Sequence, residues 1–84
     1  MSTIREVQEL VFTVEPFVEG RPGPHVRAAV AAVEAAGVQV EFGPFGTTCA
    51  ASAEAMPELV AAITRAAFAN GATHVSIHVA GEGS

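Results

Sequence analysis

The sequence has 84 residues and a formal net charge of −5, from four arginines and nine glutamates. This length limits the chain to one small domain. Half of its residues are hydrophobic and 15% are charged, which excludes a disordered chain. The arginines are scattered and form no basic stripe, so we expect no nucleic-acid partner. The single cysteine, Cys49, excludes an internal disulfide and a cysteine-rich zinc site.

The N-terminal segment, residues 1–7, carries Arg5 and Glu6 and lacks the apolar stretch of a signal peptide. No apolar run in the sequence approaches the roughly 20 residues that span a bilayer. We therefore expect a cytoplasmic protein without a membrane partner, in which a lone thiol stays reduced.

The first predicted element is a strand over residues 6–15. Its side chains alternate, with Leu10, Phe12 and Val14 on the more apolar face. Pro16 ends this strand because it lacks the N–H that a strand ladder requires.

A loop over residues 17–23, rich in glycine and proline, precedes a predicted helix. Pro24 suits the first helical position, where its missing N–H would be unpaired anyway. Apolar residues then recur at helical spacing from Val26 to Val33, and Gly37 is a suitable left-handed stop. The pattern indicates an ordinary core helix.

The next segment is predicted to be a hairpin. Residues 38–42 alternate as a strand does, and 43–46 (Gly-Pro-Phe-Gly) have turn residues at both ends. Residues 47–50 form a short third strand that contains two β-branched threonines.

The second helix begins at either Ser52 or Ala55. Pro57 favours the later start because proline fits best in a first turn, and Asn70-Gly71 ends the helix. Its expected buried face consists of Met56, Leu59, Val60, Ile63 and Ala67. A last strand follows over residues 74–79, with Val75, Ile77 and Val79 on one face and His74, Ser76 and His78 on the other.

The element order is strand, helix, strand, strand, helix, strand. Amphipathic helices and alternating strands predict an α+β fold, in which two helices cover one face of a four-stranded antiparallel sheet. Right-handed crossovers select the ferredoxin-like βαββαβ arrangement as one domain, residues 1–84, with its core at about 6–80. The term describes topology alone, since a single cysteine cannot hold an iron–sulfur cluster.

This topology brings distant segments to one rim of the sheet. They are the end of the first strand with its loop, the start of the first helix, the 43–46 turn and the start of the last strand. Glu15, Phe17 and Phe45 would share that rim, where a small planar ligand could be stacked and oriented. The alternative is that both phenylalanines cap the core and that Glu15 is only solvated.

The sheet face without helices is expected to be mixed in character. It would carry Glu9, Val11, Thr13, Glu15, Gln39, Glu41, Ser76, His78 and either Thr47 or Cys49. Such a surface is either open to water or a subunit contact, because small domains gain burial by oligomerising.

Metal and catalytic sites are not expected. On a strand, His74 and His78 lie about 13 Å apart, too far to share one ion, and His25 is isolated. Cys49 with His78 would suggest a thiol nucleophile, but nothing in the sequence shows a lowered thiol pKa, a base in contact with the thiol or an oxyanion hole. The sequence contains no Gly-x-Ser-x-Gly motif, P-loop or dinucleotide fingerprint. We therefore predict a non-enzymatic protein without a cofactor.

Two segments carry a resemblance to a known family. Residues 14–17 (Val-Glu-Pro-Phe) with the glycine-rich loop, and 43–48 (Gly-Pro-Phe-Gly-Thr-Thr), are similar in order and spacing to the YkoF-like family of small thiamine-binding proteins. The resemblance spans about residues 6–80. It implies a ferredoxin-like domain, assembled into dimers or tetramers, that binds thiamine or its hydroxymethylpyrimidine part without transforming it.

Carried over by position, Pro16 and Gly46-Thr47 match the family pattern. Ala50-Ala51 stands where relatives usually have a Glu-Gly pair. Any contact that such a glutamate makes to ligand or subunit is therefore absent in this chain.

The expected chemistry follows from the ligand's charge and rings. Glu15 would pair with the thiazolium or accept from the amino group, the phenylalanines would stack on a ring, and the threonines would hydrogen-bond ring nitrogens. The predicted ligand-binding residues are Thr13, Glu15, Phe17, Phe45, Thr47, Thr48 and His78. The alternative function is a homo-oligomeric interaction module that has no small-molecule ligand.

Overall fold

The computed structural model of the chain describes residues 7–16, 23–43 and 46–81. The elements are β1 (Val7–Glu15), α1 (Pro24–Ala35), β2 (Val40–Gly43), β3 (Gly46–Ser52), α2 (Met56–Ala69) and β4 (His74–Gly81). This order confirms the predicted ferredoxin-like α+β fold.

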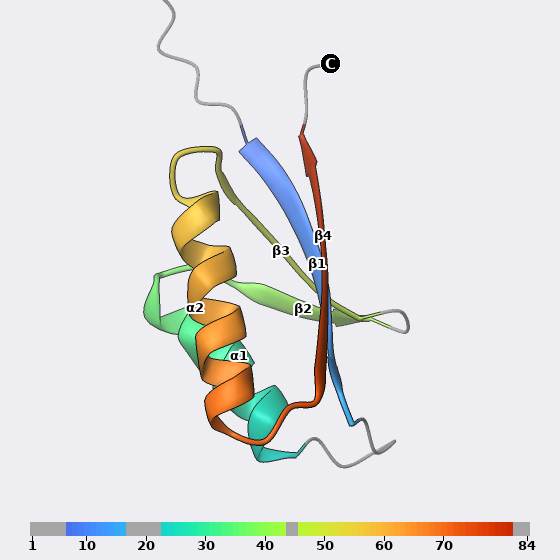
Figure 1. Cartoon of the computed structure of the whole chain (residues 1–84). Coiled ribbons are helices and arrows are strands. Elements are labelled where there is room, and N and C mark those ends of the chain that lie inside the picture. The colour runs from blue at the N-terminus through green and yellow to red at the C-terminus, as the bar shows by residue number, and fades with distance from the viewer. Residues whose placement is uncertain (1–6, 17–22, 44–45, 82–84) are drawn as a thin grey trace, which may run out of the picture.

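The four strands form one sheet in the order β2-β3-β1-β4, and every neighbouring pair is antiparallel. Figure 1 views the sheet nearly edge-on, with both helices on its left side and no helix on its right. β1 is paired on both sides, whereas β2 and β4 are the edge strands. The sheet therefore has one face covered by helices, and we call the other the open face.

The core lies between the sheet and the helices. As predicted, Leu10, Phe12 and Val14 are buried on the helix-facing side of β1, and the residues between them are more exposed. The buried apolar residues of the helices are Ala29 and Val33 from α1 and Met56, Leu59, Ile63 and Ala67 from α2. Val60, predicted to be buried, lies partly exposed against this cluster.

The helix ends follow the signals in the sequence. Pro24 begins α1, and Gly37 just after it has a φ of 82°, the left-handed conformation that stops a helix. α2 begins at Met56 with Ala55 as its N-cap, which confirms the later of the two predicted starts. Ser52 instead ends β3, and its Oγ accepts a hydrogen bond from the Ala55 N–H at 3.2 Å.

The hairpin strands have different bounds from those predicted. β2 begins at Val40 rather than at residue 38, because the Val38 N–H donates to the Val33 carbonyl and so belongs to the end of α1. β3 is longer than predicted because it pairs with β1 as far as Val7 and Ser52. The hairpin itself is confirmed by the pairing of Gly43 with Gly46.

Gly46 occupies a backbone conformation that side chains rarely adopt, with a φ of 144°. A Cβ atom there would lie 2.9 Å from the Phe12 carbonyl oxygen and 3.0 Å from Thr13 Cγ2. The absence of a side chain therefore allows the start of β3 to lie directly against β1.

The two phenylalanines at positions 12 and 68 provide a matched test of the core. Phe12 is 1% exposed and Phe68 is 53% exposed. We expect Phe12→Ala to lower the free energy of unfolding by about 3–5 kcal/mol and Phe68→Ala by about 1 kcal/mol or less. Urea unfolding followed by circular dichroism measures both; equal losses would contradict the assignment of the core.

Substitution of Gly46 tests the close approach of β3 to β1. Gly46→Ala should destabilise the fold by about 2–3 kcal/mol, because it adds both backbone strain and a steric clash. Gly37→Ala is the control, since nothing lies within 4 Å of a Cβ there and only the left-handed strain of about 1–2 kcal/mol remains. A smaller loss at position 46 than at 37, in the same unfolding assay, would refute the close approach.

Candidate functional site

A row of side chains crosses the open face from one edge of the sheet to the other. The register pairs Val11 with His78 of β4 and with Thr48 of β3, and Thr48 in turn with Glu41 of β2. Neighbouring strands lie roughly 4.8 Å apart, so these four side chains are successive neighbours. Val11 and Thr48 are partly buried, while His78 and Glu41 are exposed.

Together with Thr48 and His78, Thr13 forms a set of polar side chains around Val11, which we call the polar surround of Val11. Thr13 lies two residues further along β1 on the same face and pairs with Ser76. It is thus a diagonal neighbour of both Thr48 and His78, at roughly 7–8 Å between diagonal positions. Three of the predicted site residues, Thr13, Thr48 and His78, therefore surround one small apolar side chain.

Glu15 lies at the rim, one step beyond Thr13 on the open face. It pairs with His74, and its Oε1 is 3.8 Å from His74 Nδ1. The Glu15 and His74 side chains are 62% and 74% exposed, so this carboxylate is accessible to a ligand. The structure therefore places the end of β1 beside the start of β4, as predicted for this part of the rim.

The backbone at the rim is held from two elements. The Glu15 carbonyl accepts hydrogen bonds from the Thr73 N–H at 2.8 Å and from Thr73 Oγ1 at 3.3 Å. His25, buried in the first turn of α1, donates from Nε2 to the Pro16 carbonyl. The sequence showed His25 only as an isolated histidine, and its role in joining α1 to the end of β1 was not predicted.

Thr47 and Cys49 do not share the open face, which corrects the expectation that one of them would. Thr47 pairs with Phe12 and is 7% exposed, and Cys49 pairs with Leu10 and is 5% exposed. Because side chains alternate along a strand, both point toward the helices and Thr48 points the other way. Burial raises the pKa of the Cys49 thiol, which keeps it protonated near neutral pH.

The two phenylalanines predicted to stack on a ligand, Phe17 and Phe45, lie outside the described residues. Within the described part of the chain, the exposed phenylalanines are instead Phe42 and Phe68. Neither is part of the open face: Phe42 pairs with the helix-facing Thr47, and Phe68 belongs to α2.

A shallow hollow of about 200 Å³ lies at the opposite end of β1 from the rim. Val7, Gln8, Glu9, Ala50, Ala80 and Gly81 line it. Glu9 pairs with Ala50 on one side and Ala80 on the other, and these small side chains leave its surroundings open. Strand alternation predicts Glu9 on the open face, but the sequence does not show that two alanines meet beside it.

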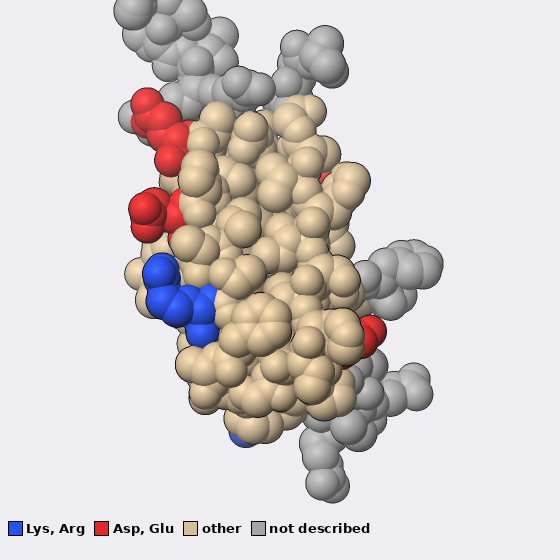
Figure 2. Space-filling model, viewed as in Figure 1, with Lys and Arg blue, Asp and Glu red and all other residues tan. Residues whose placement is uncertain are grey.

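Charge is unevenly divided between the two layers. The arginines among the described residues, Arg27 and Arg65, both lie on helices, whereas the open face carries Glu9, Glu15 and Glu41. In Figure 2 the helix side at the left carries both acidic and arginine side chains, whereas the charged atoms in view at the right, beside the strands, are acidic. The open face is therefore suited to a cation.

The described residues contain neither a group of side chains that could hold a metal ion nor a helix that could cross a membrane. No three histidine, cysteine or acidic side chains among residues 7–16, 23–43 and 46–81 gather to hold an ion. Neither α1 nor α2 combines the length and the apolar character needed to cross a bilayer.

Comparisons with known proteins address the family and the fold. None of the curated proteins matches the chain. Among solved structures, a domain of unknown function (DUF77) from Bacillus cereus is similar, with a TM-score of 0.69 and 20% sequence identity; the match covers 100% of this chain and 82% of that one. This likeness supports the fold.

The family comparison covers most of the chain. Residues 10–80 match the thiamine-binding protein family. This range includes both helices and at least part of every described strand. The chain therefore belongs to that family.

Proposed function

We propose that this domain binds thiamine or its hydroxymethylpyrimidine part on the open face of the sheet, without transforming it. The family match over residues 10–80 is the observation that carries this proposal. The polar surround of Val11 and the nearby carboxylate of Glu15 support it, because they fit the two ends of such a ligand.

The pyrimidine end suits the area around Val11. A flat heteroaromatic ring could lie over the half-buried valine, while Thr13 and Thr48 donate hydrogen bonds to its ring nitrogens. His78 can donate or accept at the remaining side, depending on its tautomer. Thr47, buried on the helix side, takes no part in this arrangement.

The thiazolium end suits the rim. Its positive charge is complementary to the exposed carboxylate of Glu15, and the open face has no arginine among its described residues to oppose it. The chain's net charge of −5 adds a weak attraction that salt screens within roughly 8 Å. Glu15 therefore discriminates thiamine from its neutral pyrimidine part.

A binding role fits the described side chains better than thiol catalysis does. Cys49 is buried and its pKa is raised by desolvation, so it lacks the thiolate that nucleophilic chemistry requires. His78, the base that could have served it, lies on the opposite face of the sheet from Cys49. The two residues cannot act together.

Self-association is part of the proposal. The resemblance to the family implies dimers or tetramers, and β4 supports this because its outer edge has no strand partner. β4 contains neither proline nor a Lys, Arg, Asp or Glu side chain, which are the usual means of blocking an edge strand from pairing with another chain.

Calorimetric titration of thiamine and of hydroxymethylpyrimidine tests the ligand proposal. We expect both to bind the wild type, and Glu15→Gln to weaken thiamine by about three- to tenfold through loss of a charged partner. The same variant should leave the neutral pyrimidine nearly unaffected.

Two controls locate the site within the open face. Glu58→Gln removes the same charge from the exposed start of α2 and should leave both affinities unchanged. Glu9→Gln should also leave both affinities unchanged. If Glu9→Gln weakened thiamine binding and Glu15→Gln did not, the cation would bind at the hollow beside Ala50 and Ala80 instead of at the rim. Absence of heat from both ligands at millimolar concentration would contradict the proposal and favour a ligand-free interaction module.

The raised pKa of Cys49 predicts that its thiol reacts slowly with alkylating agents and that the free energy of unfolding depends on pH. Alkylation by iodoacetamide should be much slower in the native protein than in urea. Because the folded pKa lies above the unfolded one, the contribution of Cys49 to stability is complete below the unfolded pKa, about 8.5. It is lost as the pH rises through the folded pKa. Urea unfolding should therefore show a loss above about pH 8.5 that Cys49→Ala lacks; fast native alkylation would contradict the burial.

A further inference from the structure

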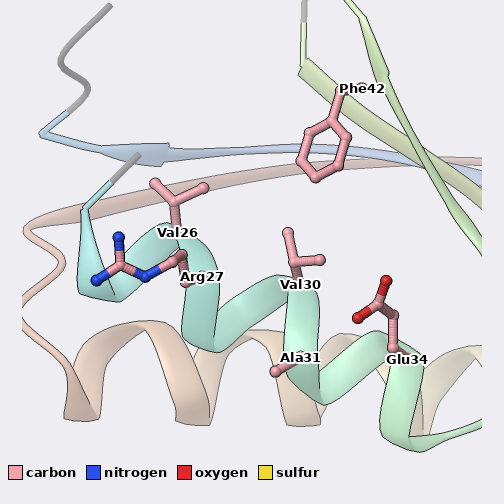
Figure 3. Close-up of a pocket in the computed structure, with 6 residues that line it drawn as sticks. All are labelled: Val26, Arg27, Val30, Ala31, Glu34 and Phe42. Atoms are coloured by element: carbon pink, nitrogen blue, oxygen red, sulfur yellow. The ribbon is translucent and has the colours of Figure 1, made fainter. Parts of the chain in front are cut away.

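A second hollow lies on the helix side, away from the open face. It has a volume of about 240 Å³ and is lined by Val26, Arg27, Val30, Ala31, Glu34 and Phe42. Figure 3 shows the Phe42 ring projecting from β2 toward Val30 of α1 across this groove. Phe42 is 70% exposed, so its ring is an apolar surface that the rest of the described chain leaves uncovered.

The outer side of α1 is unusually apolar for an exposed helix surface. Its buried residues are His25, Ala29 and Val33, and its only Lys, Arg, Asp or Glu side chains are Arg27 and Glu34. The exposed position between these two is an alanine, Ala31. A helix with so few charges around its circumference is typical of one covered on more than one side.

Arg27 and Glu34 are placed symmetrically on this surface. They are seven residues apart, about two turns or 10.5 Å along the helix, so they are not the neighbours that pair within a helix. The midpoint between them falls between Val30 and Ala31, in the middle of the groove. Opposite charges equidistant from one centre make the helix surface complementary to itself when it is turned around.

We propose that a second copy of this chain docks on the groove, with the two α1 helices antiparallel about a two-fold axis near Val30 and Ala31. Arg27 then faces Glu34 of the partner subunit, and Glu34 faces Arg27 of the partner subunit, as a two-fold interface requires. Ala31 permits close approach of the helix axes, and Phe42 covers the edge of the contact. This interface uses neither the open face nor the β4 edge, and it does not depend on the proposed ligand.

Charge reversal tests the interface through mass measured by light scattering and sedimentation across a range of protein concentrations. Arg27→Glu or Glu34→Arg alone places like charges together at two symmetric points. Each should weaken this association by roughly tenfold or more and halve the mass at intermediate concentration. Arg65→Glu makes the same change in charge on the exposed surface of α2 and should leave the mass unchanged.

Mixing the two single variants gives the decisive result. In a mixed pair, Glu at position 27 faces Arg at position 34, and the unchanged Arg27 faces the unchanged Glu34, so the association should recover. The double variant, Arg27→Glu with Glu34→Arg, should also associate as the wild type does. Circular dichroism of each variant confirms that the fold is retained.

Three outcomes would overturn the proposal. A wild type that stays monomeric at high concentration excludes any such interface. A mass unaffected by Arg27→Glu would place self-association elsewhere, for example at β4. Loss of association in the single variants without recovery on mixing would refute the antiparallel pairing of positions 27 and 34.

Discussion

The pairing of β1 on both of its sides is the constraint on which the rest of this structure depends. β3 and β4 hold β1 in register, so its two-residue alternation fixes which side chains enter the core and which face outward. Phe12 lies beneath the helices, while Val11 and Thr13 become the centre of the open face. A shift by one residue would exchange the core for the candidate site, and the two therefore depend on the same register.

Much of the fold could be predicted from the sequence because its signals are local. Alternation marks β1 and β4. Pro24 and Gly37 bracket α1, because proline suits the first helical turn and glycine tolerates the left-handed conformation that ends a helix. Right-handed crossovers then leave a single arrangement for two helices and four strands. The placement of Thr13, Glu15 and His78 on one face follows directly, because it requires only alternation and strand order.

The remaining features depend on contacts between distant segments. Residues 46–52 are small or β-branched throughout and show no apolar alternation. Which of Thr47 and Thr48 points toward the helices is therefore determined only by the pairing of β3 with β1. The openness around Glu9 likewise depends on Ala50 and Ala80 meeting across the sheet. The groove beside α1 was also beyond prediction, because the alternation of β2 indicates the side on which Phe42 lies but not that its ring stays uncovered.

The anchoring of the last residues of β1 has a consequence for how a ligand would be received. Thr73 donates a hydrogen bond to the Glu15 carbonyl, and His25 donates one to the Pro16 carbonyl. The main chain beside the Glu15 carboxylate is therefore anchored from two distant segments. In the proposed complex, only the Glu15 side chain would have to become ordered, which would keep the conformational entropy lost on binding small. If a ligand binds at Glu15 as proposed, its affinity would therefore also depend on Thr73 and His25, which need not touch it.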